Sequence, residues 1–221
     1  MRELVRENRS FFIAYLLLVI VVGVVQLVWD PTQLMLFVNT HYMPQTDLFF
    51  KYLTYVGDGL FYAALILVLL FVQYRFALAA LVSFLLTSLV AQLLKRLVFD
   101  DYYRPWRFYE NSATVKLRLV EGVQMYSNNS FPSGHATTAF SIACLLALIV
   151  RNKKWSYAFL ILACLTAYSR VYLSQHFVRD VYVGSLLGVG LTLVIMSWLW
   201  RHAARNPRDW HGARLRLKRN R

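Results

Sequence analysis

The sequence predicts an all-α, polytopic membrane protein with six transmembrane helices, short interfacial helices on the outer side and both termini in the cytoplasm. Hydrophobic residues make up 58% of the 221 residues and charged residues 16%, against ~45–50% and ~25% in average globular chains. A chain of this length has too little interior to hide so much apolar surface from water. Six apolar stretches approach the ~20 residues that a membrane-spanning helix needs. A soluble domain is therefore excluded, and two cysteines are too few for a disulfide scaffold.

The predicted spans are separated by charged and turn-forming residues. The first follows Arg2, Arg6 and Arg9 and stops at Asp30-Pro31, where proline disfavours a continuing helix. A cleaved signal peptide is the alternative for this segment, but the stretch is long for one and no Ala-x-Ala-like site follows. We therefore expect an uncleaved anchor. In chain order, the six spans are predicted at about 11–29, 59–74, 76–99, 136–150, 155–173 and 178–200.

The distribution of basic residues predicts the orientation of these spans. Of the 24 Lys and Arg residues, 15 lie at the N-terminus, after the second and fourth spans, or in the C-terminal tail. Cytoplasmic segments of membrane proteins carry such an excess, so both termini are expected inside. Residues 1–200 are predicted to form one six-span domain and residues 201–221 a basic cytoplasmic tail. The net charge of +13 would indicate nucleic acid in a soluble domain, but here we expect contact with anionic lipid and no nucleic-acid partner.

Two shorter apolar segments, residues 34–38 and 48–56, lie between the first and second spans. Both are too short to cross a membrane. Phe49, Tyr52 and Leu53 recur at helical spacing, which is typical of an amphipathic helix in the membrane interface. We expect short helices of this kind on the outer side.

Ionisable and polar residues gather near the outer ends of the later spans. Lys95 follows Arg75 by 20 residues, about 30 Å of helix, which places Lys95 at the outer boundary of the third span. Arg170 follows Lys154 by 16 residues, about 24 Å, and so lies most of the way outward along the fifth span. Ionisable groups at membrane depth are costly, which makes them candidates for function. The outer connections add residues 128–135 (NNSFPSGH), His176 and Asp180.

These residue types suit the binding of an oxyanion. Lys95, Arg104 and Arg170 would form a cationic cluster for a phosphate group. Ser133 and Gly134 directly precede an apolar helix, and the free backbone N–H groups at a helix start form another anion site.

A histidine pair accompanies this cluster. Asp180 follows His176 by four residues, and His135 stands at the start of the fourth span. This arrangement is typical of a nucleophile or base with its orienting carboxylate and a separate acid; a purely structural His–Asp hydrogen bond is the alternative. The other histidines are scattered, and no H-x-x-x-H or C-x-x-C spacing is present, so no metal site and no cofactor is expected.

Three segments resemble the signature motifs of the type 2 phosphatidic acid phosphatases. Residues 169–180 (SRVYLSQHFVRD) match their S-R-x5-H-x3-D element in full, and residues 132–135 match their P-S-G-H element. Lys95 followed by Arg104-Pro105 resembles their K-x6-R-P element, with eight residues in place of six between Lys95 and Arg104. The six-span layout extends the resemblance over nearly the whole chain.

The resemblance implies a metal-independent phosphohydrolase with a phosphohistidine intermediate. His176 would attack phosphorus while Asp180 accepts a hydrogen bond from its other ring nitrogen. His135 would protonate the departing oxygen and then activate water. The implied ligands of the phosphate oxygens are Lys95, Arg104, Arg170, the Ser133 hydroxyl and the Gly134 N–H.

The expected substrate is a lipid phosphate or pyrophosphate, such as undecaprenyl pyrophosphate, phosphatidylglycerophosphate, phosphatidic acid or a lipid A phosphate. We expect hydrolysis on the outer side of the cytoplasmic (inner) membrane. Asp58 and Glu121 are possible contacts of the substrate headgroup, with a helix cap and a loop role as their alternatives. A lipid phosphotransferase with the same site, or a non-catalytic carrier of anionic lipids, are the alternative functions.

Overall fold

The computed structural model describes residues 1–205 and 212–215, and every regular element within them is helical. The predicted basic tail, residues 201–221, therefore lies partly outside the described residues. The helices are α1 (Arg2–Glu7), α2 (Arg9–Val28), α3 (Pro31–Thr40), α4 (Pro44–Leu53), the 3₁₀-helix η1 (Thr54–Gly57), α5 (Gly59–Val72), α6 (Tyr74–Leu93), the π-helix η2 (Leu94–Val98), α7 (Pro105–Tyr109), α8 (Gly134–Ile149), α9 (Trp155–Tyr172) and α10 (Val178–Arg205).

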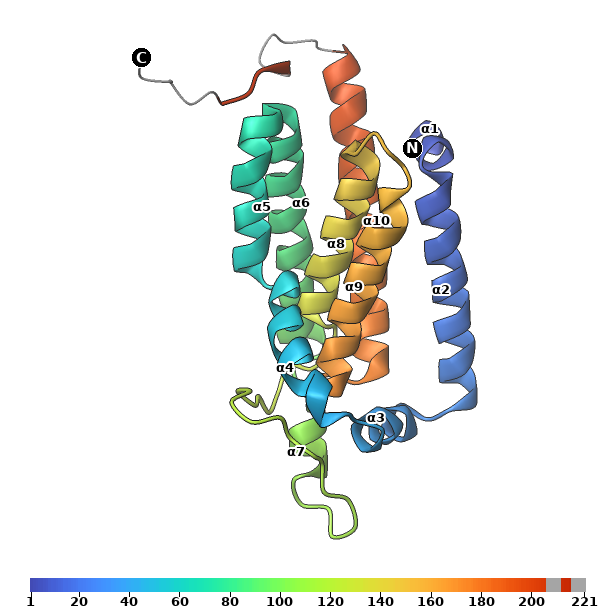
Figure 1. Cartoon of the computed structure of the whole chain (residues 1–221), viewed down its shortest axis with the longest axis vertical. Helices are drawn as coiled ribbons and strands as arrows, with labels where there is room; N and C mark the ends of the chain where they lie inside the picture. Colours follow the sequence, from blue (N-terminus) through green and yellow to red (C-terminus); the bar gives the residue numbers. More distant parts are fainter. Residues whose placement is uncertain (206–211, 216–221) are drawn as a thin grey trace.

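Helices α2, α5, α6, α8, α9 and α10 run roughly along the long axis of the molecule (Figure 1). Each coincides with a predicted span to within a few residues, α6 together with η2. Within the described part of the chain, three segments are long and apolar enough to cross a membrane: Arg9–Val28, Tyr74–Val98 and Val178–Arg205. A fourth is added if Pro44–Gly57 and Gly59–Val72, bent by 58°, form one span. The helical fold is thus confirmed, while six crossings and their orientation stay predictions.

The two ends of the bundle differ in structure. Helix α1, the turn between α5 and α6 and the loop between α8 and α9 lie at one end, and α3, α4 and α7 lie at the other (Figure 1). Ala213 accepts a hydrogen bond from the Tyr74 N–H at 2.9 Å, so the described residues around Ala213 lie at the α5–α6 turn. Both described chain ends therefore lie at the end opposite α3, α4 and α7.

The predicted interfacial segments form α3 and α4. Asp30 caps α3 by accepting from the Thr32 N–H at 2.8 Å, and α3 lies across the bundle axis (Figure 1). Helix α4 packs against α9, where the rings of Phe50 and Tyr172 are in contact with their centroids 4.5 Å apart. Phe49 and Tyr52, on the predicted amphipathic face, remain exposed.

Helix α8 forms the centre of the bundle and is buried at most of its positions. Its close contact with α10 depends on Gly184 and Gly188, one turn apart on α10. A Cβ atom at Gly184 would lie 2.6 Å from the carbonyl oxygen of Ser133. Small residues at this spacing let two membrane helices approach closely. The approach lets the Ser133 N–H donate to the Asp180 carbonyl at 2.9 Å, which joins the starts of α8 and α10.

Candidate active site

The predicted catalytic and phosphate-binding residues lie at the end of the bundle that carries α3, α4 and α7. They come from separate parts of the chain: Lys95 from η2, Arg104 from the residue before α7, Ser133, Gly134 and His135 from the start of α8, Arg170 from the end of α9, and His176 and Asp180 from the start of α10. These residues therefore lie at one end of the molecule, as the depths predicted from the lengths of the spans require.

Asp180 holds His176 in a buried hydrogen-bond network. The Nδ1 atom of His176 lies 3.3 Å from Oδ2 of Asp180, and the two side chains are exposed by only 1% and 0%. The same Oδ2 accepts hydrogen bonds from the Phe177 N–H at 3.0 Å and from the Ser130 hydroxyl at 2.5 Å. A carboxylate beside Nδ1 favours the tautomer with its proton there, which leaves the lone pair of Nε2 available.

The electrostatic setting keeps His176 uncharged. Burial lowers the pKa of His176 well below its ordinary value, and the positive charges of Arg104 and Lys95 lower this pKa further. The ring is therefore neutral at pH 7, and neutral imidazole is its nucleophilic form. As the pH falls, burial and the neighbouring positive charges both oppose protonation of His176. The neutral ring therefore persists at pH values below the ordinary pKa of histidine.

Ser130 is a member of this network that the sequence did not single out. Its hydroxyl contacts Asp180 and lies 3.5 Å from Nδ1 of His176. The residue lies in the segment NNSFPSGH, but a serine three residues before Ser133 carries no signal of its own. The involvement of Ser130 is visible only in the folded chain, where its hydroxyl donates a hydrogen bond to Asp180.

Replacing Ser130 with alanine is expected to lower kcat by about ten- to a hundredfold, the worth of a hydrogen bond to a charged group. KM should change little, because Ser130 acts on Asp180 and not on the substrate, and Ser130→Thr should restore part of kcat. Ser156→Ala is the matched control, since Ser156 is equally buried but its hydroxyl has no hydrogen-bond partner among the described residues. Equal kcat in Ser130→Ala and wild type would contradict this role.

Gln175 links two of the predicted cations. Its Oε1 accepts hydrogen bonds from Nη1 of Arg104 at 3.1 Å and from Nη2 of Arg170 at 3.5 Å. Arg170 also donates from Nη1 to the Thr54 hydroxyl at 2.7 Å, while its Nε has no hydrogen-bond partner among the described residues. The two guanidinium groups are thus held side by side. Sequence reasoning missed Gln175 and Thr54, because an uncharged side chain between motif residues gives no indication of its partners.

Lys95 joins the group despite its unusual spacing from Arg104. The helix widens into η2 at this point, and Lys95 is buried, with 6% of its surface exposed. Its Nζ donates to the carbonyl of Asn129 at 3.0 Å. Arg104 is fixed nearby by its backbone N–H, which donates to the Ser127 carbonyl at 2.8 Å. The π-helical turn and the loop after it therefore accommodate eight residues, and such turns recur at functional sites.

The start of α8 leaves open space beside its backbone. Ser133 caps the helix by accepting from the Ala136 N–H at 3.4 Å, and a Cβ atom at Gly134 would meet nothing within 4 Å. By contrast, a Cβ atom at Gly57 would lie 2.7 Å from the His135 carbonyl oxygen. The η1–α5 turn therefore packs directly on His135, while the first N–H groups of α8 remain accessible to an anion.

A cavity of about 370 Å³ leads to these residues. Its lining includes His135, Arg170 and Gln175, together with Lys51 and Tyr126. A histidine and a guanidinium group therefore face the same space, as a site for phosphate chemistry requires.

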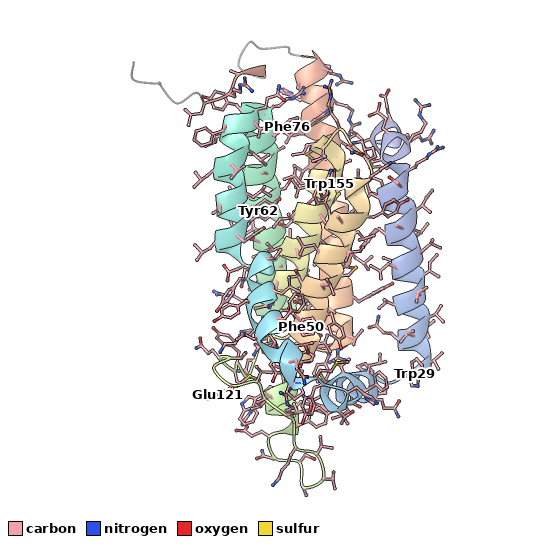
Figure 2. The ribbon with its side chains drawn as sticks, viewed as in Figure 1. Trp29, Phe50, Tyr62, Phe76, Glu121 and Trp155 are labelled. Carbon is pink, nitrogen blue, oxygen red and sulfur yellow. The ribbon has the colours of Figure 1, made fainter. Side chains whose placement is uncertain are left out.

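The two predicted headgroup contacts have different positions. Asp58 caps α5 by accepting from the Leu60 N–H at 2.9 Å, and it also lines the cavity beside His135. Glu121 lies in a loop at the edge of the molecule (Figure 2), where its backbone carbonyl accepts from Nζ of Lys51 at 2.8 Å. Glu121 is not among the residues that line the cavity, so the structure brings Asp58 but not Glu121 to the site.

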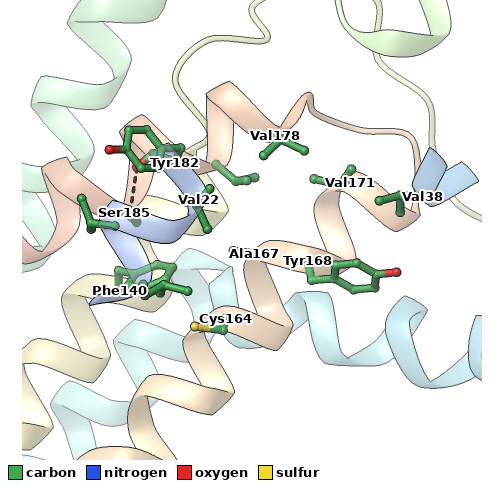
Figure 3. A pocket seen from close by; sticks show the side chains of 13 residues that line it. Val22, Val38, Phe140, Cys164, Ala167, Tyr168, Val171, Val178, Tyr182 and Ser185 are labelled. Atoms are coloured by element: carbon green, nitrogen blue, oxygen red, sulfur yellow. Dashed lines mark hydrogen bonds between the residues drawn. The ribbon is translucent and has the colours of Figure 1, made fainter. Parts of the chain in front are cut away.

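A separate apolar cavity of about 280 Å³ lies between α2, α9 and α10 (Figure 3). Val22, Phe140 and Val178 contribute to its lining, and Ser185 donates there to the Tyr182 carbonyl at 2.7 Å. None of the predicted site residues lines this cavity.

The model of the PAP2 superfamily matches residues 76–204, which include every residue of the two histidine motifs and of the basic group. The lipid A 4'-phosphatase of Bacteroides thetaiotaomicron is 30% identical over 168 residues, 71% of each chain. The bacitracin transport permease protein BcrC of Bacillus licheniformis is 39% identical over 71 residues, 32% of this chain, and the match spans only 34% of BcrC.

Solved structures show the same fold. The structure of LpxE from Aquifex aeolicus superposes with a TM-score of 0.65 at 24% identity, over 75% of this chain and 93% of LpxE. The likeness therefore extends from the motifs to the arrangement of the helices.

Proposed function

The chain belongs to the PAP2 superfamily, and from this premise we propose that it is a membrane phosphatase that removes a phosphate group from a lipid without a metal ion. The observation that carries the proposal is the buried network of His176, Asp180 and Ser130 beside the paired guanidinium groups of Arg104 and Arg170. A neutral, oriented imidazole next to a cationic group is what in-line attack on a phosphate ester needs.

In the proposed first step, Nε2 of His176 attacks phosphorus and the bond between phosphorus and the lipid oxygen breaks. Asp180 stabilises the positive charge on the ring through Nδ1–H, and His135 donates a proton to the leaving oxygen. In the second step, water attacks the phosphohistidine while His135 takes its proton, which releases inorganic phosphate and restores His176.

The remaining site residues are proposed to bind the three equatorial oxygens of the phosphate. Charge builds up on these oxygens in the transition state, and positioned cations and N–H donors stabilise it. The proposed ligands are Lys95, Arg104, Arg170, the Ser133 hydroxyl and the Gly134 N–H.

The site is proposed to face the outer side of the cytoplasmic membrane. The turn between α5 and α6 and the loop between α8 and α9 lie at the opposite end of the bundle from the site (Figure 1). Arg75 follows the first of these and Arg151, Lys153 and Lys154 lie in the second, and basic segments of this kind favour the cytoplasm. Residues 1–200 would then form one six-span catalytic domain, with residues 201–221 as a cytoplasmic tail. Undecaprenyl pyrophosphate, phosphatidylglycerophosphate, phosphatidic acid and lipid A phosphates are the candidate substrates, and the lipid A 4'-phosphatase relatives support the last of these.

The proposal is tested by measuring inorganic phosphate released from each candidate lipid by the purified protein in detergent, with and without excess EDTA. Among the described residues, no group of three His, Cys, Asp or Glu side chains could hold a metal ion. We expect at least one substrate to be hydrolysed at a rate that EDTA does not change. Loss of activity in EDTA with recovery on adding a divalent cation would overturn the metal-independent mechanism. Lipid binding without phosphate release, or transfer of the phosphate to another lipid, would overturn hydrolysis.

A further inference from the structure

A second cavity adjoins His135 on a different side from the first. It measures about 230 Å³ and lies between α5, α6 and α8, and we name it the flank cavity. His135 and Asp58 line both the flank cavity and the larger cavity that contains Arg170. A substrate whose phosphate lies among His135 and the cations can therefore extend into the flank cavity.

Helix α6 presents two polar side chains to the flank cavity. Phe84, Ser88 and Gln92 recur every four residues, so they lie on one face of α6, and all three line the cavity. Gln92 precedes Lys95 by three residues, near the end of a segment long and apolar enough to cross a membrane. No described residue forms a hydrogen bond with its amide. Gln92 is exposed, so its amide is available to hydrogen-bond a ligand that extends into the flank cavity.

The charge of the flank cavity restricts what it can hold. Asp58 contributes a carboxylate, whereas none of the described residues that line the cavity is Lys or Arg. A second phosphate group beside the reacting one would lie against Asp58 without a cation of its own in this cavity. Hydroxyl, amide or ester groups would instead find donors and acceptors in Gln92 and Ser88.

We propose that the flank cavity binds the part of the lipid directly attached to the phosphate, and that Gln92 and Ser88 select carriers with hydrogen-bonding groups there. The favoured substrates are monophosphates of sugar-linked or glycerol-linked lipids. Polyprenyl monophosphates, which offer only hydrocarbon at this position, and polyprenyl diphosphates, which offer a second phosphate, are disfavoured. The inference rests on the proposed phosphatase function and names its substrate class.

The test measures kcat/KM for four substrates: a lipid A phosphate, phosphatidic acid, a polyprenyl monophosphate and a polyprenyl diphosphate. Wild type should prefer the first two, and the first pair shows whether sugar or glycerol is favoured. For the lipid A phosphate and for phosphatidic acid, Gln92→Leu should lower kcat/KM relative to that for the polyprenyl monophosphate by about three- to tenfold. This factor corresponds to the loss of one hydrogen bond. Gln26→Leu, on α2 and outside both cavities, is the matched control and should leave the ratios unchanged.

A second variant tests the charge argument independently. Asparagine caps a helix as well as aspartate does, so Asp58→Asn should keep the start of α5 intact. Its kcat/KM for the diphosphate, relative to the polyprenyl monophosphate, should rise severalfold. If the kcat/KM ratios in Gln92→Leu and Asp58→Asn equal those of the wild type, the inference about the flank cavity is wrong, while the proposed hydrolysis still stands. Failure of the wild type to release phosphate from any of the four would instead overturn the proposed function.

Discussion

Replacing His176 with alanine is expected to lower phosphate release by at least about 10⁴-fold, because removal of a covalent nucleophile leaves only binding and charge stabilisation. The imidazole is held by Asp180 and is neutral, which is the form that attacks phosphorus. The measurement is kcat for the best lipid phosphate at saturating substrate. Because catalysis and not binding is lost, KM should remain within a few-fold of the wild-type value.

The buried position of His176 requires controls for folding. Alanine leaves a cavity and removes the imidazole partner of Asp180, so His176→Gln is the second variant, since its amide can still donate to the carboxylate. His41→Ala is the matched control, because His41 is exposed at the end of α3 and, within the described structure, its side chain forms hydrogen bonds only with residues of its own turn. Thermal unfolding in detergent should be similar for His176→Gln and wild type. Substantial hydrolysis by a folded His176→Gln protein would rule out a phosphohistidine.

The amino-acid sequence predicted the helices and that most residues of the candidate site lie at one end of the bundle, because both follow from local patterns; the roles of these residues stay predictions. Apolar length locates α2, α6 and α10, and the depth at which Lys95 and Arg170 occur follows from the rise of a helix. These properties require no knowledge of contacts between distant residues.

The parts that sequence reasoning missed all depend on contacts between distant residues. Ser130 and Gln175 matter through hydrogen bonds to Asp180 and to Arg104, which the chain brings together only when folded. The π-helical turn at Lys95 is a local change of helix type that, with the loop after it, accommodates the longer spacing to Arg104, and hydropathy does not detect it. Gly184 acts through the backbone of α8, and Glu121 does not line the cavity although Gly122 and Gln124 of the same loop do.

His135 is expected to serve both steps of the reaction, and His135→Gln separates them. For a lipid substrate the leaving oxygen is strongly basic and needs a proton, so kcat should fall by about 10²–10⁴-fold. For p-nitrophenyl phosphate the leaving group needs no acid, so the first step should proceed while water attack on the intermediate is slow. The expected result is a burst of about one p-nitrophenol per enzyme followed by slow turnover.

The trapped intermediate gives this prediction a direct chemical readout. His135→Gln protein incubated with p-nitrophenyl phosphate should gain one acid-labile phosphate, detected by intact mass before and after acid treatment. The double variant with His176→Gln should gain none, which assigns the phosphate to His176. Glutamine keeps the backbone and the Cβ atom of position 135, and these are the atoms that pack against Gly57, so the start of α8 should retain its geometry. If the single variant shows neither a burst nor a bound phosphate while it still turns over slowly, then water attacks the substrate directly and His176 is not the nucleophile.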